Sequence, residues 1–233
     1  MIIENIKMII RFIIFTLLLA SQAMADKASK KAEFEQLYAE FSDLYANSDN
    51  IDPVIIVAEK LYKLAPRVYG KKSEEYAIVI YNLANLYDEK GGEEPNDTEK
   101  KAADLYNKYF RMQNLRKVPK DLNYLNQYIP YMVAYYNSHP YNAKISIGEQ
   151  MLELAHSLDL QKIELANLEY TFAIQNARMY RYKIAQPAFQ KAYEIYLDEF
   201  GKNNFKVAET LFWLAKIDLA YEKMELSIEK LLN

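Results

Sequence analysis

Residues 182–201 read YKIAQPAFQKAYEIYLDEFG, and residues 207–215 follow as VAETLFWLA. In both stretches small and large apolar residues recur at spacings of three and four, which places them on one face of an α-helix. Gly201 separates the two patterns, as expected of a residue that ends one helix shortly before the next begins. The stretch therefore predicts two helices that are joined by a short turn.

The second of these patterns recurs along the chain. Residues 76–84 (YAIVIYNLA) match it at an offset of 131, and residues 165–173 (LANLEYTFA) precede it by 42. A further copy lies around Ala39, and a weaker one spans residues 124–131. After these copies comes a second helical pattern with a small residue, at Ala58, Ala102, Gly148 and Ala185. Such a period predicts stacked helix pairs, each of which buries its apolar face against its neighbours.

The composition fits a helical chain and excludes several kinds of chemistry. Of the 233 residues, 51% are apolar, which is enough for a core, and only five are glycine. The absence of cysteine excludes disulfides, thiolate nucleophiles and cysteine-ligated zinc. A net charge of −3 provides no basic field for nucleic acid. Because the sequence also lacks hydrolase, phosphate-loop and metalloprotease motifs, we expect no enzymatic activity, no cofactor and no metal.

Two histidines and one acidic stretch are weaker candidates for function. His139 precedes Pro140 in an expected turn, and His156 is expected to end a helix, where a cation complements the helix dipole. The stretch Asp88–Asp97 mixes acids with glycine and proline. We interpret it as a solvated loop of about ten residues within the second repeat, with a cation or partner site as the alternative.

Prolines mark expected helix starts and one irregular repeat. Pro53, Pro119 and Pro187 suit the first turn of a helix, where the missing N–H costs nothing. Pro130 stands at a position that other repeats fill with leucine or phenylalanine. We therefore expect a kinked helix or a shifted register in the third repeat.

Residues 1–25 have the order of a secretory signal peptide. Lys7 and Arg11 precede an apolar run at residues 12–20, and Ala23-Met24-Ala25 follows. We expect cleavage after Ala25, a short linker at residues 26–32, and a periplasmic or secreted mature chain. The alternative is a membrane anchor, which requires about 20 apolar residues; this run has nine, and Arg11 separates it from Ile9 and Ile10.

The segment from Tyr182 to Ala215 resembles the tetratricopeptide repeat, in the long form seen in kinesin light chains. The resemblance covers residues 33–233. It implies an all-α solenoid, a right-handed superhelix of about five helix-turn-helix pairs. The pairs are expected at about residues 33–69, 73–116, 120–158, 160–200 and 203–233, the last one truncated.

The resemblance also implies which aromatic residues bind a partner. In tetratricopeptide repeats the first helix of each pair lines a concave groove, and one position in each copy points into it. Here these positions hold Tyr81, Tyr128, Tyr170 and Phe212, with Ala39 in the first repeat. Aromatic rings offer a large contact area at low rotamer cost. The alternative is that the rings pack between adjacent repeats and contact no ligand.

Two polar residues complete the expected partner-binding set. Asn85 and Lys216 follow the small residue of their repeats and could bind the backbone or a carboxylate of an extended peptide. Chaperone-binding members of the family use lysine at the position where this chain has aromatics. A clamp for a C-terminal carboxylate is therefore not expected here.

These observations predict a non-catalytic interaction scaffold that binds a protein or peptide in its concave groove. The alternative is the repeat section of a larger cell-envelope protein or assembly, such as a TonB-like energy transducer, or a structural adaptor. It is motivated by Ser227 to Leu231, where a second-helix pattern begins just before Asn233. We expect protein partners, envelope complexes among them, no nucleic acid, and no stable membrane insertion after signal cleavage.

Overall fold

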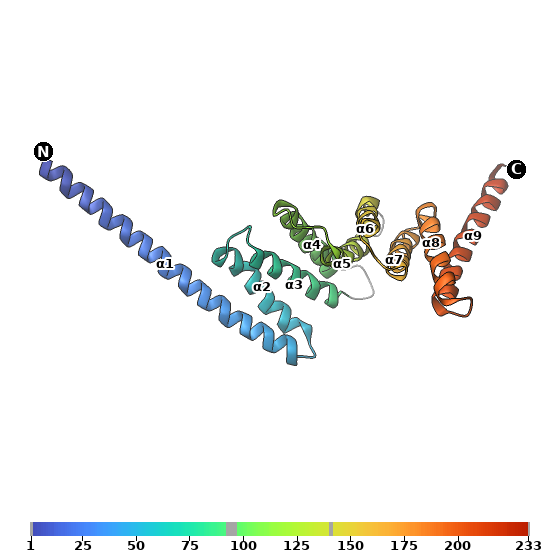
Figure 1. Cartoon of the computed structure of the whole chain (residues 1–233), viewed down its shortest axis with the longest axis horizontal. Coiled ribbons are helices and arrows are strands. Elements are labelled where there is room, and N and C mark those ends of the chain that lie inside the picture. Colours follow the sequence, from blue (N-terminus) through green and yellow to red (C-terminus); the bar gives the residue numbers. More distant parts are fainter. Residues whose placement is uncertain (1, 92–96, 140–141, 233) are drawn as a thin grey trace. The chain divides into compact units, whose positions relative to one another are not determined.

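The computed structural model describes residues 2–91, 97–139 and 142–232. Within these ranges the chain consists of helices without a strand, which confirms the all-α prediction (Figure 1). The helices are α1 (Ile2–Asn47), α2 (Ile51–Val68), α3 (Glu74–Lys90), α4 (Asp97–Leu115), α5 (Leu122–Ser138), α6 (Ile145–Ser157), α7 (Lys162–Arg178), α8 (Tyr182–Phe200) and α9 (Phe205–Leu232).

The helices fall into two compact units. The first unit comprises Met1–Gly91 and Asp104–Val118, and the second comprises Gly92–Ala103 and Pro119–Asn233. In the first unit α2 packs on both α1 and α3. In the second unit each helix from α5 to α9 packs on the next one in the chain. This packing between sequence neighbours is what stacked helix pairs require, because each pair buries its apolar face on the adjacent helices.

Local sequence signals set several helix boundaries. Ser73 and Asp121 precede α3 and α5, and their side chains accept hydrogen bonds from the N–H groups of Tyr76 and Tyr124 at 3.1 and 2.9 Å. Gly201 ends α8 with φ of 73°, a left-handed conformation that side chains disfavour. The turn expected at Gly201 is therefore confirmed.

Small residues of the repeat lie where helices approach closely. Ala58, Ala102 and Ala185 are buried. Gly148 takes the equivalent place in α6, where a Cβ would lie only 2.4 Å from Cδ2 of Phe172 on α7. The approach of α6 to α7 therefore requires glycine at this position.

Replacing Gly148 by alanine is expected to lower the free energy of unfolding by about 1–2 kcal/mol. The overlap with the Phe172 ring outweighs the gain of about 1 kcal/mol in helix propensity. Urea denaturation followed by circular dichroism measures the difference. Ser146→Ala, at an exposed position of the same helix, is the matched control and should leave stability within about 0.5 kcal/mol. A Gly148→Ala variant as stable as the wild type would contradict the close approach.

Two of the three prolines expected in first turns lie elsewhere. Pro53 is in the first turn of α2 as predicted, but Pro119 precedes α5, and Pro187 is in the second turn of α8. Pro187 removes the hydrogen bond to the carbonyl of Lys183. Lys183 and Pro187 are both exposed, so water can donate to the Lys183 carbonyl in place of the missing N–H. Helix α5 continues through Pro130.

Three segments are more helical than the sequence suggested. Asp88 to Lys90 continue α3 and Asp97 begins α4, so the acidic loop is shorter than the ten residues expected; residues 92–96 lie outside the described residues. Residues 26–32, expected as a linker, belong to α1, and residues 227–231 continue α9. None of these helical segments contains glycine or proline, which would end a helix.

Candidate functional site

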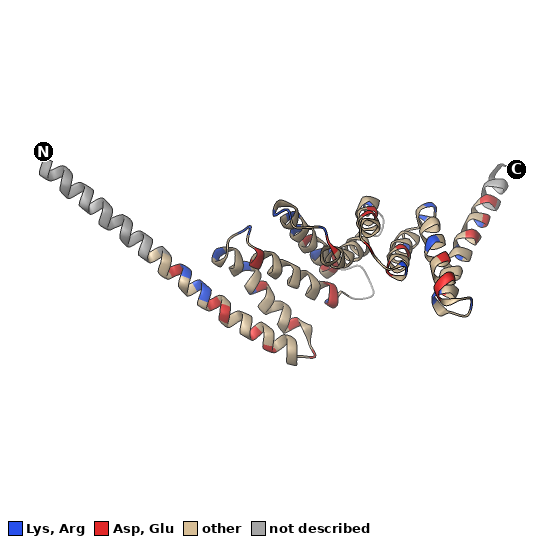
Figure 2. Ribbon diagram, in the orientation of Figure 1, with Lys and Arg blue, Asp and Glu red and all other residues tan. Residues whose placement is uncertain are grey.

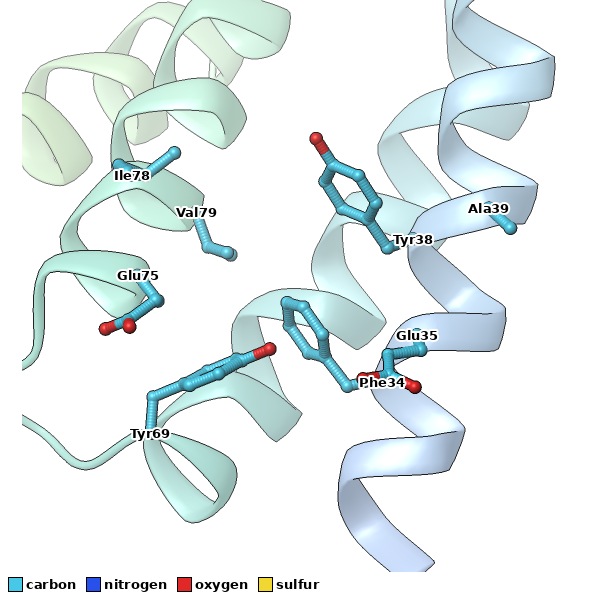
Figure 3. A pocket seen from close by; sticks show the side chains of 8 residues that line it. All are labelled: Phe34, Glu35, Tyr38, Ala39, Tyr69, Glu75, Ile78 and Val79. Carbon is cyan, nitrogen blue, oxygen red and sulfur yellow. The ribbon is translucent and has the colours of Figure 1, made fainter.

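Helices α1 and α3 form the two walls of an open groove, and Tyr69 at the end of α2 lies at its floor. One pocket of about 390 Å³ is lined by Phe34, Glu35, Tyr38, Ala39, Tyr69, Glu75, Ile78 and Val79 (Figure 3). A second pocket of about 160 Å³ lies further along the same helices, lined by Phe41, Tyr45, Asn82, Asn85, Leu86 and Glu89. We call the two pockets together the α1–α3 groove.

A row of four aromatic rings lines the α1 wall. Phe34, Tyr38, Phe41 and Tyr45 follow one another at spacings of four, three and four, with ring centroids 6.4, 6.2 and 5.9 Å apart. Phe34 is buried, whereas Tyr38 and Tyr45 are 52% and 61% exposed. Phe41 between them is partly buried, and exposed large rings such as Tyr38 and Tyr45 on one helix face are typical of an interaction surface.

The floor of the groove is apolar and its edge is acidic. Tyr69 packs edge-on against Phe34, with the ring centroids 5.1 Å apart. Burial, together with the carboxylates of Glu35 and Glu75, raises the pKa of Tyr69. Figure 3 shows the Tyr38 ring pointing from α1 into the space that Val79 borders on α3. An apolar side chain entering this space would meet rings and be flanked by carboxylates.

The α3 wall combines an apolar and a polar part. Ile78 is 50% exposed although it lines the first pocket. Asn85 lines the second pocket and accepts a hydrogen bond from the Tyr106 hydroxyl at 2.6 Å. Asn82 has no hydrogen-bond partner in the part of the chain that the structure describes. Its amide can therefore bind a ligand without losing an internal contact.

Two of the predicted partner-binding rings pack within their own helix pair. Tyr81 is half-buried, with its ring centroid 5.7 Å from Tyr106 and 4.9 Å from Tyr109 on α4. Tyr170 is also half-buried and contacts Phe189 of α8 at 5.6 Å. Burial is the main cause of the raised pKa of both hydroxyls. Both rings thus pack against a neighbouring helix, which is close to the alternative that these aromatics contact no ligand. Ligand binding by Tyr81 and Tyr170 stays a prediction.

The remaining predicted residues differ in exposure. Tyr128 is buried, and its hydroxyl donates to Oε1 of Gln150 at 3.2 Å. Phe212 is 62% exposed and packs edge-on against Trp213, and Nζ of Lys216 lies 4.5 Å from the centroid of the Trp213 ring. Of the predicted set, Asn85 lines the α1–α3 groove, as does Ala39 of the first repeat.

The comparisons with known proteins bear on the fold. No family model and no curated protein matches the chain. Among solved structures, it is similar to nearly identical TPR-like repeats assigned to a kinesin light chain of Podosopora anserina, with 11% identity and a TM-score of 0.62 over 85% of this chain and 92% of that one. A single-residue variant of that protein matches equally, over 91% of its length. This chain has a tetratricopeptide-type repeat fold.

The tetratricopeptide resemblance alone did not reveal the ring row on α1. Alignment of the first repeat placed Ala39 at the groove position, where no ring could be expected. The signal was nevertheless present, because Phe34, Tyr38, Phe41 and Tyr45 have the spacing of one helix face. Two of these rings, Tyr38 and Tyr45, stay exposed although α2 packs on α1.

One charged cluster lies away from the groove, in the second unit. Glu169 of α7 is only 2% exposed, and its Oε1 lies 3.0 Å from Nε2 of His156 on α6 and 3.1 Å from Nζ of Lys191 on α8. His156 is in the last turn of α6, as predicted. The cluster links three consecutive helices of the repeat fold, so we interpret it as a structural network of charged side chains.

The described ranges contain neither a metal-binding cluster nor a membrane-spanning helix. No group of three or more acidic, histidine or cysteine side chains there could hold a metal ion. Among the described residues, no helix combines the length and the apolar character needed to cross a membrane.

Proposed function

We propose that this chain is a non-catalytic protein-interaction scaffold whose partner binds in the α1–α3 groove. The observation that supports this most strongly is the row of rings on α1, in which Tyr38 and Tyr45 are exposed, together with the exposed Ile78 on α3. Rigid helices hold both walls in place, so little conformational entropy is lost when a partner binds. Tyrosine is also a residue type that often dominates binding energy at protein interfaces.

The order of charged, apolar and small residues at positions 1–25 supports a periplasmic or secreted location, with cleavage after Ala25. The alternative role, as the repeat section of a larger envelope protein or an adaptor in such an assembly, would use the same groove. Reading the coding region beyond Asn233 tests the first of these two roles, because the repeat section of a larger protein requires a further domain in frame.

A photo-crosslinking amino acid at Tyr38 tests the groove directly. We expect discrete crosslinked products between the full chain and a partner protein. The same amino acid at Tyr180, which is 77% exposed in the second unit, should give none of these products. Identical products from both positions, or none from Tyr38, would contradict the proposal.

The double variant Tyr38→Ala/Ile78→Ser measures how much the groove contributes to affinity. Both side chains line the first pocket and are about half exposed, so their loss should leave the fold intact. We expect affinity for the crosslinked partner to fall at least about tenfold, as for central interface residues. Tyr180→Ala serves as the matched control, and an equal affinity of all three proteins would exclude the groove as the site.

A further inference from the structure

We infer that the occupant of the α1–α3 groove is an amphipathic helix of a partner protein that carries lysine or arginine at both ends of its apolar stripe. This inference rests on the proposed function and adds the chemistry of the partner.

Both walls of the groove come from helix segments with an excess of acids. Residues 32–47 of α1 contain four acids and no lysine or arginine, and α3 contains four acids and one base, Lys90 (Figure 2). Of these acids, Glu35, Glu75 and Glu89 line the groove, whereas Glu33 and Glu40 line a different pocket, beside lysines of α2. Lys90 is paired with Asp52 of α2. The basic residues of the described part of α1 all precede residue 32; Figure 2 shows them in blue between acids, and Lys30 and Lys31 are paired with Asp26 and Glu35. A cationic partner would therefore be attracted to the walls, and an anionic one repelled.

Carboxylates stand at both ends of the groove. Glu75 lines the first pocket and Glu89 lines the second. Neither has an ion pair or a hydrogen bond within the described residues. Glu35 also lines the first pocket, and its ion-pair partner among the described residues is Lys31, at 3.9 Å on the same helix. Glu75 and Glu89 are therefore available to a basic partner at no cost in internal contacts, and Glu35 would give up one weak, exposed ion pair.

The spacing of the walls' side chains fits a helix. Glu75 and Glu89 are 14 residues apart, about four turns or about 21 Å along α3. The ring row from Phe34 to Tyr45 covers about 16 Å of α1. A helix of four to five turns would place apolar residues at every third and fourth position along the rings and Ile78. Its basic residues would then reach the carboxylates at the two ends.

A pair of synthetic peptides tests the inference on the full chain. The first peptide is an amphipathic helix of about five turns, with leucine on one face and lysine elsewhere; in the second, glutamate replaces every lysine. We expect the lysine peptide to bind at least about tenfold more tightly by isothermal titration calorimetry. Its affinity should fall as salt is raised.

Charge reversal within the groove is the decisive comparison. Glu75→Lys/Glu89→Lys should weaken binding of the lysine peptide about tenfold and strengthen binding of the glutamate peptide. The control Glu153→Lys/Glu225→Lys makes the same change in net charge at two exposed positions that do not line the groove. It should alter affinity less than about twofold. Equal binding of both peptides, or equal effects of both double variants, would overturn the inference.

The failure of the inference can be told apart from the failure of the proposed function. If Tyr38 crosslinks a partner whose affinity is unchanged by Glu75→Lys/Glu89→Lys, the groove binds a partner of other chemistry and only the inference fails. A crosslinked product with twice the mass of this chain would identify a second copy as the occupant, which also overturns the inference. If Tyr38→Ala/Ile78→Ser binds both the partner and the lysine peptide as the wild type does, both proposals fail.

Discussion

Replacing Tyr106 by alanine is expected to lower the free energy of unfolding by about 3–5 kcal/mol. Tyr106 is fully buried in the first unit, and its ring packs at 5.7 Å from Tyr81. Its hydroxyl donates a hydrogen bond to Oδ1 of Asn85 at 2.6 Å. Truncation would leave a cavity between α3 and α4 and would remove the hydroxyl that Asn85 accepts from.

Chemical denaturation followed by circular dichroism measures this loss, with two controls. Tyr106→Phe keeps the ring and removes only the hydroxyl, so we expect a loss of about 0.5–1.5 kcal/mol. Tyr180→Ala truncates a ring that is 77% exposed and should cost less than about 0.5 kcal/mol. If Tyr106→Ala were no more destabilising than Tyr106→Phe, ring burial would not be what holds α3 and α4 together.

Helix pairing could be predicted from the sequence because the buried positions of each pair hold small and large apolar residues at regular spacings. Ala102 and Ala185 recur at the small position of the second helices, and both are completely buried. Gly148 stands at the same position of its repeat, and its close approach to the Phe172 ring leaves no space for a side chain. A repeat that must stack on its neighbours keeps this pattern of small and large residues in every copy, whatever its surface does.

The direction in which each ring points could not be read from the repeat. Tyr81 and Tyr170 occupy the position expected to face a ligand, yet their rings lie against α4 and α8. The choice depends on Tyr109 and Phe189, which come from the following helix and fill the space beside each ring. The position in the repeat determines on which side of its helix the ring lies. The side chains of the following helix determine what the ring contacts.

The acidic edge of the groove likewise depends on the fold. Glu35 and Glu75 are 40 residues apart in the sequence, and both flank Tyr69 only because α2 packs on α1 and α3. The ring row from Phe34 to Tyr45, in contrast, is local and lies on one helix face. The apolar half of the site was therefore readable from the sequence, whereas the charged half required the packing of three helices.

Raising the pH above 10 is expected to unfold the protein cooperatively. In the described residues ten tyrosines have a pKa raised above 10, mainly by burial. Burial is the largest cause for Tyr131 and Tyr196, and it raises the pKa of each to about 12. Nearby Tyr135 adds to the shift at Tyr131, and Glu209 adds to that at Tyr196.

The sign of the effect follows from which state binds the proton more tightly. Below pH 10 these tyrosines are neutral in both states, and their contribution to stability is fully present. Above pH 10 the unfolded chain loses these protons before the folded chain does, so each tyrosine lowers stability as the pH rises, by up to about 1.4 kcal/mol per pH unit. The summed loss from several such tyrosines equals the whole free energy of unfolding of an ordinary domain, about 5–15 kcal/mol.

Tyrosinate absorbance and the helical circular dichroism signal should therefore change together, with a midpoint between pH 10 and 12. The variant Tyr131→Phe/Tyr196→Phe keeps both rings and removes two ionisable hydroxyls. It should release fewer protons on unfolding, so its stability should fall less steeply across this range even if it is lower at neutral pH, because Tyr196 loses its hydrogen bond to Asn167. Complete ionisation of all tyrosines with the helical signal unchanged would mean that these hydroxyls are open to water in the folded state.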